Sequence, residues 1–199
     1  IFLLLCMLIW ISIFTLQSFN GLLFVLIVLA SYQAYTNKGK LEQIMPFIYP
    51  TIPFIILYFI YLEYTINAIV WLLFIVALTD SFAYFGVKLL GGKLFSNSTF
   101  CKTSPNKTKE GVLIGVIFSV IISTLIGLGV CDFLSSLIIS LCASIASIFG
   151  DLYESYLKRQ AGVKDSGKLF PGHGGMLDRL DGYFFGGIIL YISLTLLPR

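Results

Sequence analysis

Charged residues are scarce in this sequence. Only 12% of its 199 residues are Asp, Glu, Lys or Arg, whereas 58% are hydrophobic and the mean hydropathy is +0.95. Soluble domains contain roughly 45–50% apolar and about 25% charged residues, so the composition excludes an ordinary soluble domain. Because lipid cannot hydrogen-bond an irregular backbone, we expect an all-α fold, a polytopic integral membrane helical bundle.

Histidine and cysteine are also scarce, which excludes several kinds of site. The chain has one histidine, His173, and four cysteines without metal-ligand spacing, so we expect neither a zinc protease helix nor a cysteine-rich zinc site. Gly91 is followed by Gly92 rather than by Lys, so the glycines there do not form a P-loop. The net charge of +3 is small, and we expect no nucleic acid partner.

What the sequence does contain is a series of long apolar runs. A helix needs about 20 residues to cross the roughly 30 Å hydrocarbon layer of a membrane. By this measure we expect about seven transmembrane helices, at 1–19, 22–36, 46–62, 66–88, 111–131, 134–156 and 182–197. The second run is short, so 1–36 forming one long helix with a re-entrant piece is an alternative. No basic segment precedes the first run, and we expect no cleaved signal peptide.

The basic residues are distributed unevenly between the loops. Of the thirteen Lys and Arg residues, two, five and five lie respectively in loops 37–45, 88–110 and 157–181. These loops alternate with the others and therefore share one side of the membrane. The positive-inside rule makes that side the cytoplasm, so we expect a multi-pass protein of the cell inner (plasma) membrane with its long polar loops on the cytoplasmic side.

Small residues recur at intervals of four in several apolar runs. Gly111 with Gly115, Ser140 with Ser144, and Gly182 with Gly186 fit close packing of helices. Gly and Ser are also common in spans in general, which is the alternative interpretation.

The polar segment 150–181 is the richest in groups that can perform chemistry. Asp151 and Glu154 stand three residues apart where one predicted span ends, and Asp178 and Asp181 repeat that spacing where the next begins. Glycines and a proline between them allow a loop that folds the two helix ends together. Four converging carboxylates repel one another unless a cation or basic partner offsets their charge.

Two interpretations of these carboxylates remain open. Oxygen ligands favour Mg²⁺ or a similar hard cation, which binds through one or two carboxylates and substrate phosphates. Alternatively, Arg159, Arg179 and the neighbouring lysines pair with the acids without any metal.

A second group of polar residues lies upstream. Asp80 stands within an apolar run, where a carboxylate costs roughly 2.5–3.5 kcal/mol, so we expect it to face a polar interior. Ser104, Lys107 and Thr108 precede a predicted span, and a helix N-terminus flanked by lysines suits an anion such as a triphosphate. A plain loop with cytoplasmic lysines is the alternative.

The run from Ser155 to Asp181 closely resembles the signature of CDP-diacylglycerol synthases, also called phosphatidate cytidylyltransferases. The shared residues are Ser155, Lys158-Arg159, Lys164-Asp165, Gly167, Pro171, His173-Gly174-Gly175, Asp178-Arg179 and Asp181. Upstream, the similar residues are Asp80-Ser81, Ala83-Tyr84, Gly86, Ser104-Pro105, Lys107-Thr108 and Glu110-Gly111. The chain departs from the family pattern at Phe82, Asn106 and Lys109, and the resemblance covers about 80–182.

This resemblance implies a metal-dependent nucleotidyltransferase of phospholipid biosynthesis, which converts CTP and phosphatidic acid into CDP-diacylglycerol and pyrophosphate. It implies one membrane-embedded domain over 1–199, with N-terminal spans in 1–65 and the catalytic spans and loops in 66–199. It also implies a homodimer and Mg²⁺, with or without an accompanying K⁺, held by Asp151, Asp178 and Asp181.

The remaining candidate residues divide by expected role. Lys158, Arg159 and Lys164 are expected to be catalytic, by neutralising the lipid phosphate or the departing pyrophosphate. The expected substrate-binding residues are Asp80, Ser104, Lys107, Thr108, His173 and Arg179. His173 contacts substrate or only stabilises its turn.

Two other functions compete with this one. A CTP-dependent polyprenol kinase shares the nucleotide and metal but phosphorylates an alcohol. An ion-coupled transporter would use Asp80 and the other carboxylates as a pathway. Segment 150–181 is too basic and glycine-rich for an ion path, which argues against the transporter.

Overall fold

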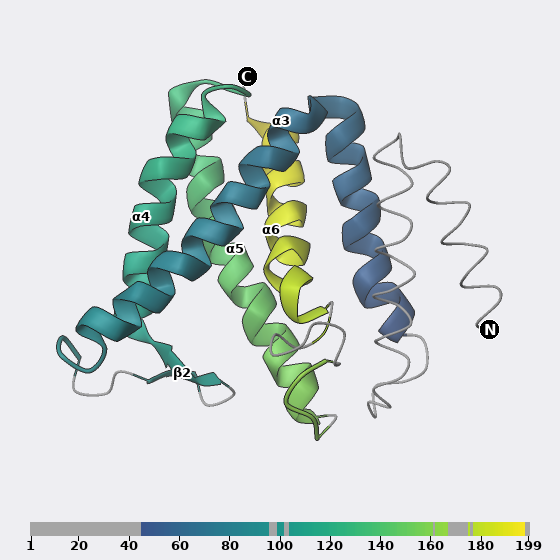
Figure 1. Cartoon of the computed structure of the whole chain (residues 1–199). Coiled ribbons are helices and arrows are strands. Elements are labelled where there is room, and N and C mark those ends of the chain that lie inside the picture. Colours follow the sequence, from purple (N-terminus) through teal and green to yellow (C-terminus); the bar gives the residue numbers. More distant parts are fainter. Residues whose placement is uncertain are drawn as a thin grey trace.

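The computed structural model describes residues 45–95, 99–101, 104–160, 162–166, 175 and 177–197. The predicted spans 1–19 and 22–36 lie outside the described residues, as does His173. Within the described part, the elements are α3 (Met45–Leu90), β1 (Thr99–Cys101), β2 (Ser104–Thr108), α4 (Lys109–Gly127), α5 (Phe133–Gln160) and α6 (Leu177–Leu196). The helices form a bundle in which the second half of α3 crosses in front of α5 and α6 (Figure 1).

Helix α3 replaces two predicted spans and the loop between them. The loop expected at 63–65 is helical, because neither Gly nor Pro interrupts the backbone hydrogen bonds there. The ribbon nevertheless bends sharply between its two halves (Figure 1), which correspond to the apolar stretches Thr51–Tyr64 and Ile66–Leu90. Hydrogen bonds from Tyr191 to Glu63 and between Tyr64 and Thr195, both 3.3 Å, fasten the bend to α6.

The other helix boundaries differ from the expected spans by a few residues. Helix α4 ends at Gly127, four residues early, and α6 begins at Leu177, five residues early. Asp132 accepts hydrogen bonds from the backbone N–H groups of Leu134 and Ser135 and so caps the start of α5. Hydrogen bonds from the Ser135 side chain and backbone hold the pKa of Asp132 below its usual value.

Three helical segments of the described chain are long and apolar enough to cross a membrane: Ile66–Leu90, Lys109–Gly127 and Phe133–Gln160. Thr51–Tyr64 is apolar but shorter. Helix α6 is not among the three, and charged residues occupy its first turns. The helical membrane fold is confirmed to this extent, and the number of seven spans stays a prediction.

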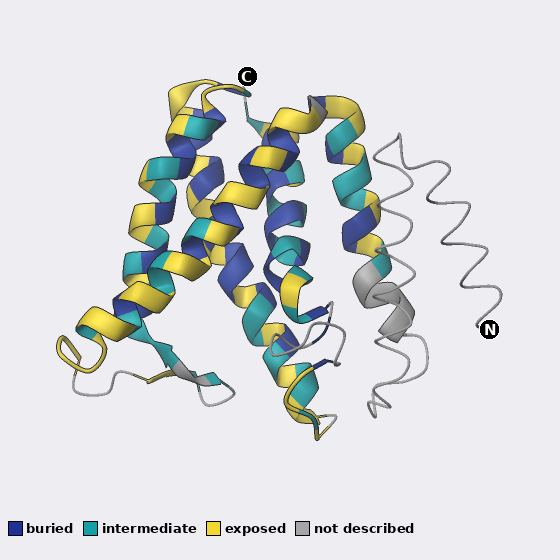
Figure 2. Cartoon of the chain, viewed as in Figure 1, coloured by how far each residue is buried: buried dark blue, intermediate teal, exposed yellow. Residues whose placement is uncertain are grey.

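Helix α4 has two contrasting faces. Leu113, Ile117, Ile121 and Leu125 are exposed large apolar side chains spaced four apart, as expected of a lipid-facing surface. The opposite face is a buried row of small residues, Gly111, Gly115, Ser119, Ser123 and Gly127. Figure 2 shows the same division around the bundle, with buried residues turned inward and exposed residues outward.

The row of small residues brings the backbones of α3 and α4 into close contact. A Cβ added to Gly115 would lie 2.7 Å from the carbonyl oxygen of Thr79 and 2.9 Å from the Cβ of Ala83. On α6, a Cβ added to Gly182 would lie 2.9 Å from Val76. The expectation that spaced glycines pack helices closely is therefore confirmed at these positions.

Gly115→Ala is expected to destabilise the bundle by about 1–3 kcal/mol, because the added methyl overlaps backbone and side-chain atoms of α3. Thermal unfolding of the purified protein in detergent measures this loss. Gly129→Ala is the matched control, since the nearest atom to its added Cβ is the Ile126 carbonyl oxygen at 3.5 Å. Equal unfolding temperatures for the two variants would contradict the close approach of α3 and α4.

Candidate functional site

The polar connections of the described chain gather at one end of the bundle. The β1–β2 hairpin, loop 162–166 and the first turn of α6 all lie at the lower end in Figure 1, whereas the bend of α3 and the turn before α5 lie at the other. The expectation that the two long polar loops share one side is thus met in their described parts.

A cavity of about 760 Å³ opens at this polar end, where α3, the hairpin, α4 and α5 meet. We call it the Asp80 pocket, and its lining residues are Asp80, Ala83, Tyr84, Val87, Ser104, Lys107, Thr108, Gly111, Val112, Ile148 and Asp151. Four of the predicted substrate-binding residues line it, together with Asp151, one of the predicted metal ligands. Residues more than 70 positions apart in the sequence therefore share one cavity.

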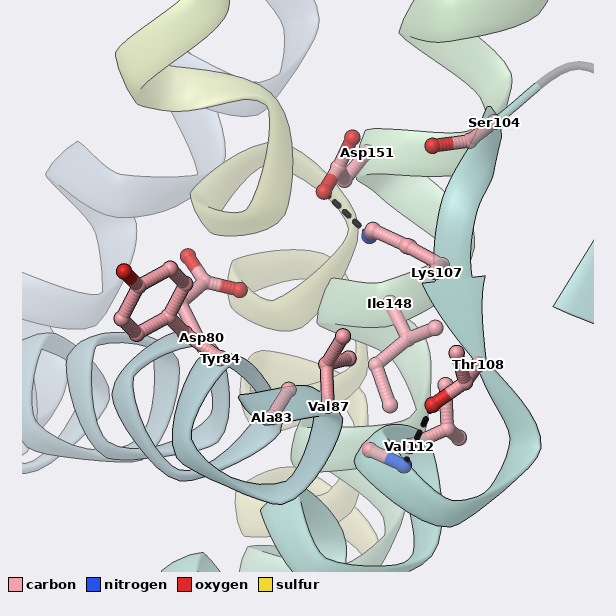
Figure 3. A pocket seen from close by; sticks show the side chains of 11 residues that line it. Asp80, Ala83, Tyr84, Val87, Ser104, Lys107, Thr108, Val112, Ile148 and Asp151 are labelled. Atoms are coloured by element: carbon pink, nitrogen blue, oxygen red, sulfur yellow. Dashed lines mark hydrogen bonds and ion pairs between the residues drawn. The ribbon is translucent and has the colours of Figure 1, made fainter. Parts of the chain in front are cut away.

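The polar side of the Asp80 pocket is built from opposite charges. Lys107, at the end of β2, reaches across to α5 and forms an ion pair with Asp151 (Figure 3). Asp80 on α3 interacts electrostatically with Lys107, Asp151 and Arg179. Arg179 itself is exposed, in the first turn of α6. Among the residues that the structure describes, the pocket itself therefore holds one cationic side chain, Lys107, beside two carboxylates, and positive charge of this kind suits a phosphate group.

The Asp80 pocket also has an apolar wall. Ala83, Val87, Val112 and Ile148 contribute aliphatic side chains, and the ring of Tyr84 is 65% exposed. Figure 3 shows the Tyr84 ring beside Asp80, across the cavity from Lys107. An amphipathic lining of this kind suits a ligand that carries both charged and apolar groups.

The hairpin that carries Lys107 is anchored at the start of α4. The Thr108 hydroxyl caps that helix by accepting a hydrogen bond of 3.1 Å from the Gly111 N–H. Glu110 is fully buried, and its Oε1 accepts hydrogen bonds from the backbone N–H groups of Gly92 and Phe95, both 3.2 Å. No role of its own was predicted for Glu110 from the sequence. Its position in the first turn of α4, two residues after the capping residue, is a signal that it organises this turn.

A second charged cluster surrounds Asp178, about two helical turns along α5 from Asp151, where Lys158 lies. Its carboxylate accepts hydrogen bonds from Lys158 Nζ (2.6 Å), the Ser166 N–H and hydroxyl (2.8 and 2.7 Å) and the Gly175 N–H (2.6 Å). Burial disfavours the ionised form, but these hydrogen bonds outweigh it and lower the pKa of Asp178 to about 2. Asp178 therefore ties loop 162–166 and the end of α5 to the start of α6.

Glu154 lies beside this cluster and is 2% exposed. Its Oε1 is 3.5 Å from Lys158 Nζ, so Lys158 bridges Glu154 and Asp178. Within the described parts of the chain, neither carboxylate oxygen of Glu154 has a hydrogen-bond partner. From the sequence, Glu154 was expected on the same helix face as Asp151, but no role was predicted for it. The signal that could have found it is its spacing of three residues from Asp151.

Asp181 connects the two clusters. A Cβ on Gly150 would overlap the Asp181 carbonyl oxygen, so α5 and α6 touch directly beside Asp151. Asp181 is buried, accepts a 2.7 Å hydrogen bond from the Gly182 N–H, and interacts electrostatically with Asp151 and Asp80. Asp80 and Asp151 therefore share the pocket, Asp181 interacts with both without lining it, and Asp178 is engaged by its own donors. The predicted gathering of carboxylates around a metal stays a prediction.

Comparison with known proteins agrees with this geometry. A family model described as the cytidylyltransferase family matches residues 1–197. The chain belongs to the cytidylyltransferase family. It is 46% identical over 172 residues to a phosphatidate cytidylyltransferase of Helicobacter pylori strain J99, an alignment that covers 85% of this chain and 63% of that protein. The chain thus spans about two thirds of the length of this relative.

More distant relatives carry the same name. A Thermotoga maritima phosphatidate cytidylyltransferase is 44% identical over 126 residues, covering 59% of this chain and 45% of that protein. The chloroplastic phosphatidate cytidylyltransferase 4 of Arabidopsis thaliana is 43% identical over 116 residues, covering 57% of this chain and 28% of that protein. The resemblance found in the sequence is therefore confirmed at the level of the family.

The predicted metal ligands of this cytidylyltransferase differ in how well they suit a cation. In the described part of the chain, no group of three or more His, Cys, Asp and Glu residues is arranged to hold a metal ion. Asp151 and Asp181, with Asp80 close by, nevertheless offer the oxygen donors that Mg²⁺ prefers, and their mutual repulsion favours a cation. Asp178 suits this role less, because its carboxylate is already engaged by four donors.

The other predicted catalytic cations of the cytidylyltransferase lie outside the Asp80 pocket. Lys158 is committed to Glu154 and Asp178, while Arg159 and Lys164 are exposed at the end of α5 and in loop 162–166. Their catalytic roles stay predictions.

Ser166→Ala is expected to loosen loop 162–166 and destabilise the cytidylyltransferase by about 1–2 kcal/mol, because Asp178 loses a hydroxyl donor. Thermal unfolding and limited proteolysis of the loop measure the effect. Asp165→Ala, at the exposed neighbouring position, is the control and should leave both unchanged. If the control is cleaved as fast as Ser166→Ala, Asp178 does not hold the loop.

Proposed function

We propose that this chain is a phosphatidate cytidylyltransferase, which joins the cytidylyl group of CTP to phosphatidic acid and releases pyrophosphate. The observation that carries the proposal is the Asp80 pocket, where Lys107 and Asp151 meet beside Asp80 in a cavity that also has an apolar wall. The names of the family relatives point in the same direction. A nucleotide and a lipid head group both require phosphate recognition next to apolar surface.

The reaction is an attack by a phosphate oxygen of phosphatidic acid on the α-phosphorus of CTP. A new P–O bond forms while the bond to pyrophosphate breaks, so no covalent enzyme intermediate is required. Both reactants are anions, and the principal tasks of the protein are therefore to position them and to offset their charge. Lys107 and Arg179 are the cations best situated for this, since both interact with Asp80 at the pocket.

A divalent cation fits the carboxylates of the Asp80 pocket. Asp151 and Asp181 would hold Mg²⁺, with Asp80 nearby, whereas Asp178 would have to exchange a hydrogen bond to contribute. Such an ion supplies positive charge that offsets the phosphates of both substrates. When Asp151 binds it, Lys107 is available to contact phosphate.

The position of the pocket suits substrates at a membrane surface. We assign the polar end of the bundle to the cytoplasmic side of the cell inner membrane, because its loops contain most of the basic residues. The acyl chains of the lipid then stay among the apolar faces of the spans while the phosphate reaches the pocket. A multi-pass protein of about seven helices, acting as a homodimer, completes the proposal.

Purified protein given phosphatidic acid and CTP labelled in the cytidine ring should produce labelled lipid. The labelling should stop when a chelator removes divalent metal and should be lost in Asp151→Asn and Asp178→Asn. Label absent from lipid despite CTP turnover would indicate a kinase of a lipid alcohol rather than a cytidylyltransferase. Labelling that persists with chelator would remove the metal from the proposal.

Lys107→Met should lower kcat/KM by about 10- to 100-fold, the effect of losing a charged hydrogen bond to phosphate. Steady-state rates at varied CTP and lipid concentrations measure it. Lys88→Met is the matched control, because Lys88 is an exposed lysine in the last turn of α3 that does not line the pocket. Comparable losses in both variants would indicate a general charge effect instead of a contact at the pocket.

A further inference from the structure

Among the described residues, three buried polar atoms in the core of the bundle have no hydrogen-bond partner. They are the indole nitrogen Nε1 of Trp71 on α3, the hydroxyl of Ser123 on α4 and the hydroxyl of Ser140 on α5. Each of the three residues is 0% exposed. Buried polar groups normally have a partner, either in the protein or in an ordered water molecule.

The contacts around Gly127 show where the Trp71 indole lies relative to α4 and α5. A Cβ on Gly127 would overlap the Cε2 and Cζ2 atoms of the Trp71 indole and the hydroxyl oxygen of Ser136. Ser136 also donates a 2.7 Å hydrogen bond to the Thr124 carbonyl oxygen. The edge of the indole, α4 and α5 therefore meet at the level of Gly127.

A second set of contacts, around Thr79, joins the same three helices at another level of the bundle. Thr79 Oγ1 lies 2.9 Å from Ser119 Oγ and 2.8 Å from Ser144 Oγ, so α3, α4 and α5 meet again there. Ser123 lies one turn from both Gly127 and Ser119, and Ser140 lies one turn from both Ser136 and Ser144. The antiparallel register of α4 and α5 thus places Ser123 and Ser140 at one level of the bundle, one turn from the level at which the Trp71 indole meets Gly127.

The hydroxyls of Thr79 and Ser119 donate hydrogen bonds that the hydroxyls of Ser123 and Ser140 do not make. Thr79 and Ser119 both donate to the Ile75 carbonyl oxygen, at 2.7 and 2.9 Å, as hydroxyls buried within helices commonly do. Ser123 and Ser140 make no such bond. Both serines therefore belong to the layer of the bundle between the contact of Trp71 with Gly127 and the contacts of Thr79 with Ser119 and Ser144, and their hydroxyls have no hydrogen-bond partner among the described residues.

We propose that this layer binds an ordered water molecule that bridges Trp71, Ser123 and Ser140. The indole N–H can only donate, so the occupant must accept a hydrogen bond, and each serine hydroxyl can donate or accept. Water provides both functions in the smallest volume and usually makes about three hydrogen bonds in such sites. A cation does not fit, because the indole N–H presents its positive end to the space.

The bound water links α3, α4 and α5 next to the Thr79 contact. Thr79 directly precedes Asp80, so the water helps to fix the register in which α3 presents Asp80 to the pocket. This is a structural site within the bundle, separate from the site of the reaction.

A double-mutant cycle tests the water bridge. Trp71→Phe removes the N–H and keeps an aromatic ring, while Ser140→Ala removes the hydroxyl. Each is expected to lower the unfolding temperature in detergent by about 2–4 °C, and the double variant should lose clearly less than the sum, because either change alone releases the same water. Ser123→Ala should couple to Trp71→Phe in the same way.

Cys142→Ala is the control, since Cys142 is exposed on the other face of α5 and should be additive with Trp71→Phe. Additive effects at Ser123 and Ser140, whatever their size, would overturn the proposal, as would substitutions that leave stability unchanged or raise it. If a variant does not fold, resonance Raman spectroscopy of Trp10→Phe protein, which retains Trp71 alone, decides instead. An indole N–H without a hydrogen bond overturns the proposal, and a hydrogen-bonded one supports it.

Discussion

The close approach of α3, α4 and α5 along small residues is the constraint on which the rest of the structure depends. Gly111 and Gly115 have no side chain to separate the helices, so the backbone of α4 lies against backbone carbonyl groups of α3, and Gly127 leaves room for the Trp71 indole and the Ser136 hydroxyl. In a lipid environment such contacts, and the hydrogen bonds that they allow, stabilise helix association. The hydrophobic effect contributes little there, because lipid tails are as apolar as the side chains that would be buried. The hydroxyl contacts around Thr79 form only because the helices are this close.

That packing also determines the chemistry of the polar end. Once α3, α4 and α5 are in register, Asp80, Lys107 and Asp151 reach one cavity from three separate parts of the chain. The contact of Gly150 with the Asp181 backbone adds α6 to the same neighbourhood. Charge is then divided between two clusters, one facing the Asp80 pocket and the other, around Asp178, holding a loop to the bundle.

Much of this could be predicted from the sequence, because the signals are local. Apolar runs specify helices of a membrane protein, and the positions of α4 and α5 were predicted to within a few residues. The loop expected at 63–65 was wrong because residues outside a run of high hydropathy were taken to break the helix, although nothing in their backbone chemistry does so. The roles of Glu110 and Glu154 were missed, since burial of a carboxylate depends on partners distant in sequence.

The sequence by itself determined that the chain forms membrane helices, that its polar loops share one side, and that it resembles cytidylyltransferases. Composition and spacing suffice for this, because each of those properties arises from neighbouring residues. Only the tertiary structure decided which of these residues share a cavity, placing Asp151 with Asp80 and Lys107 and leaving Asp178 among hydrogen-bond donors. Spacing along one helix fixes which face a residue occupies, but the packing of helices against one another fixes what that face meets.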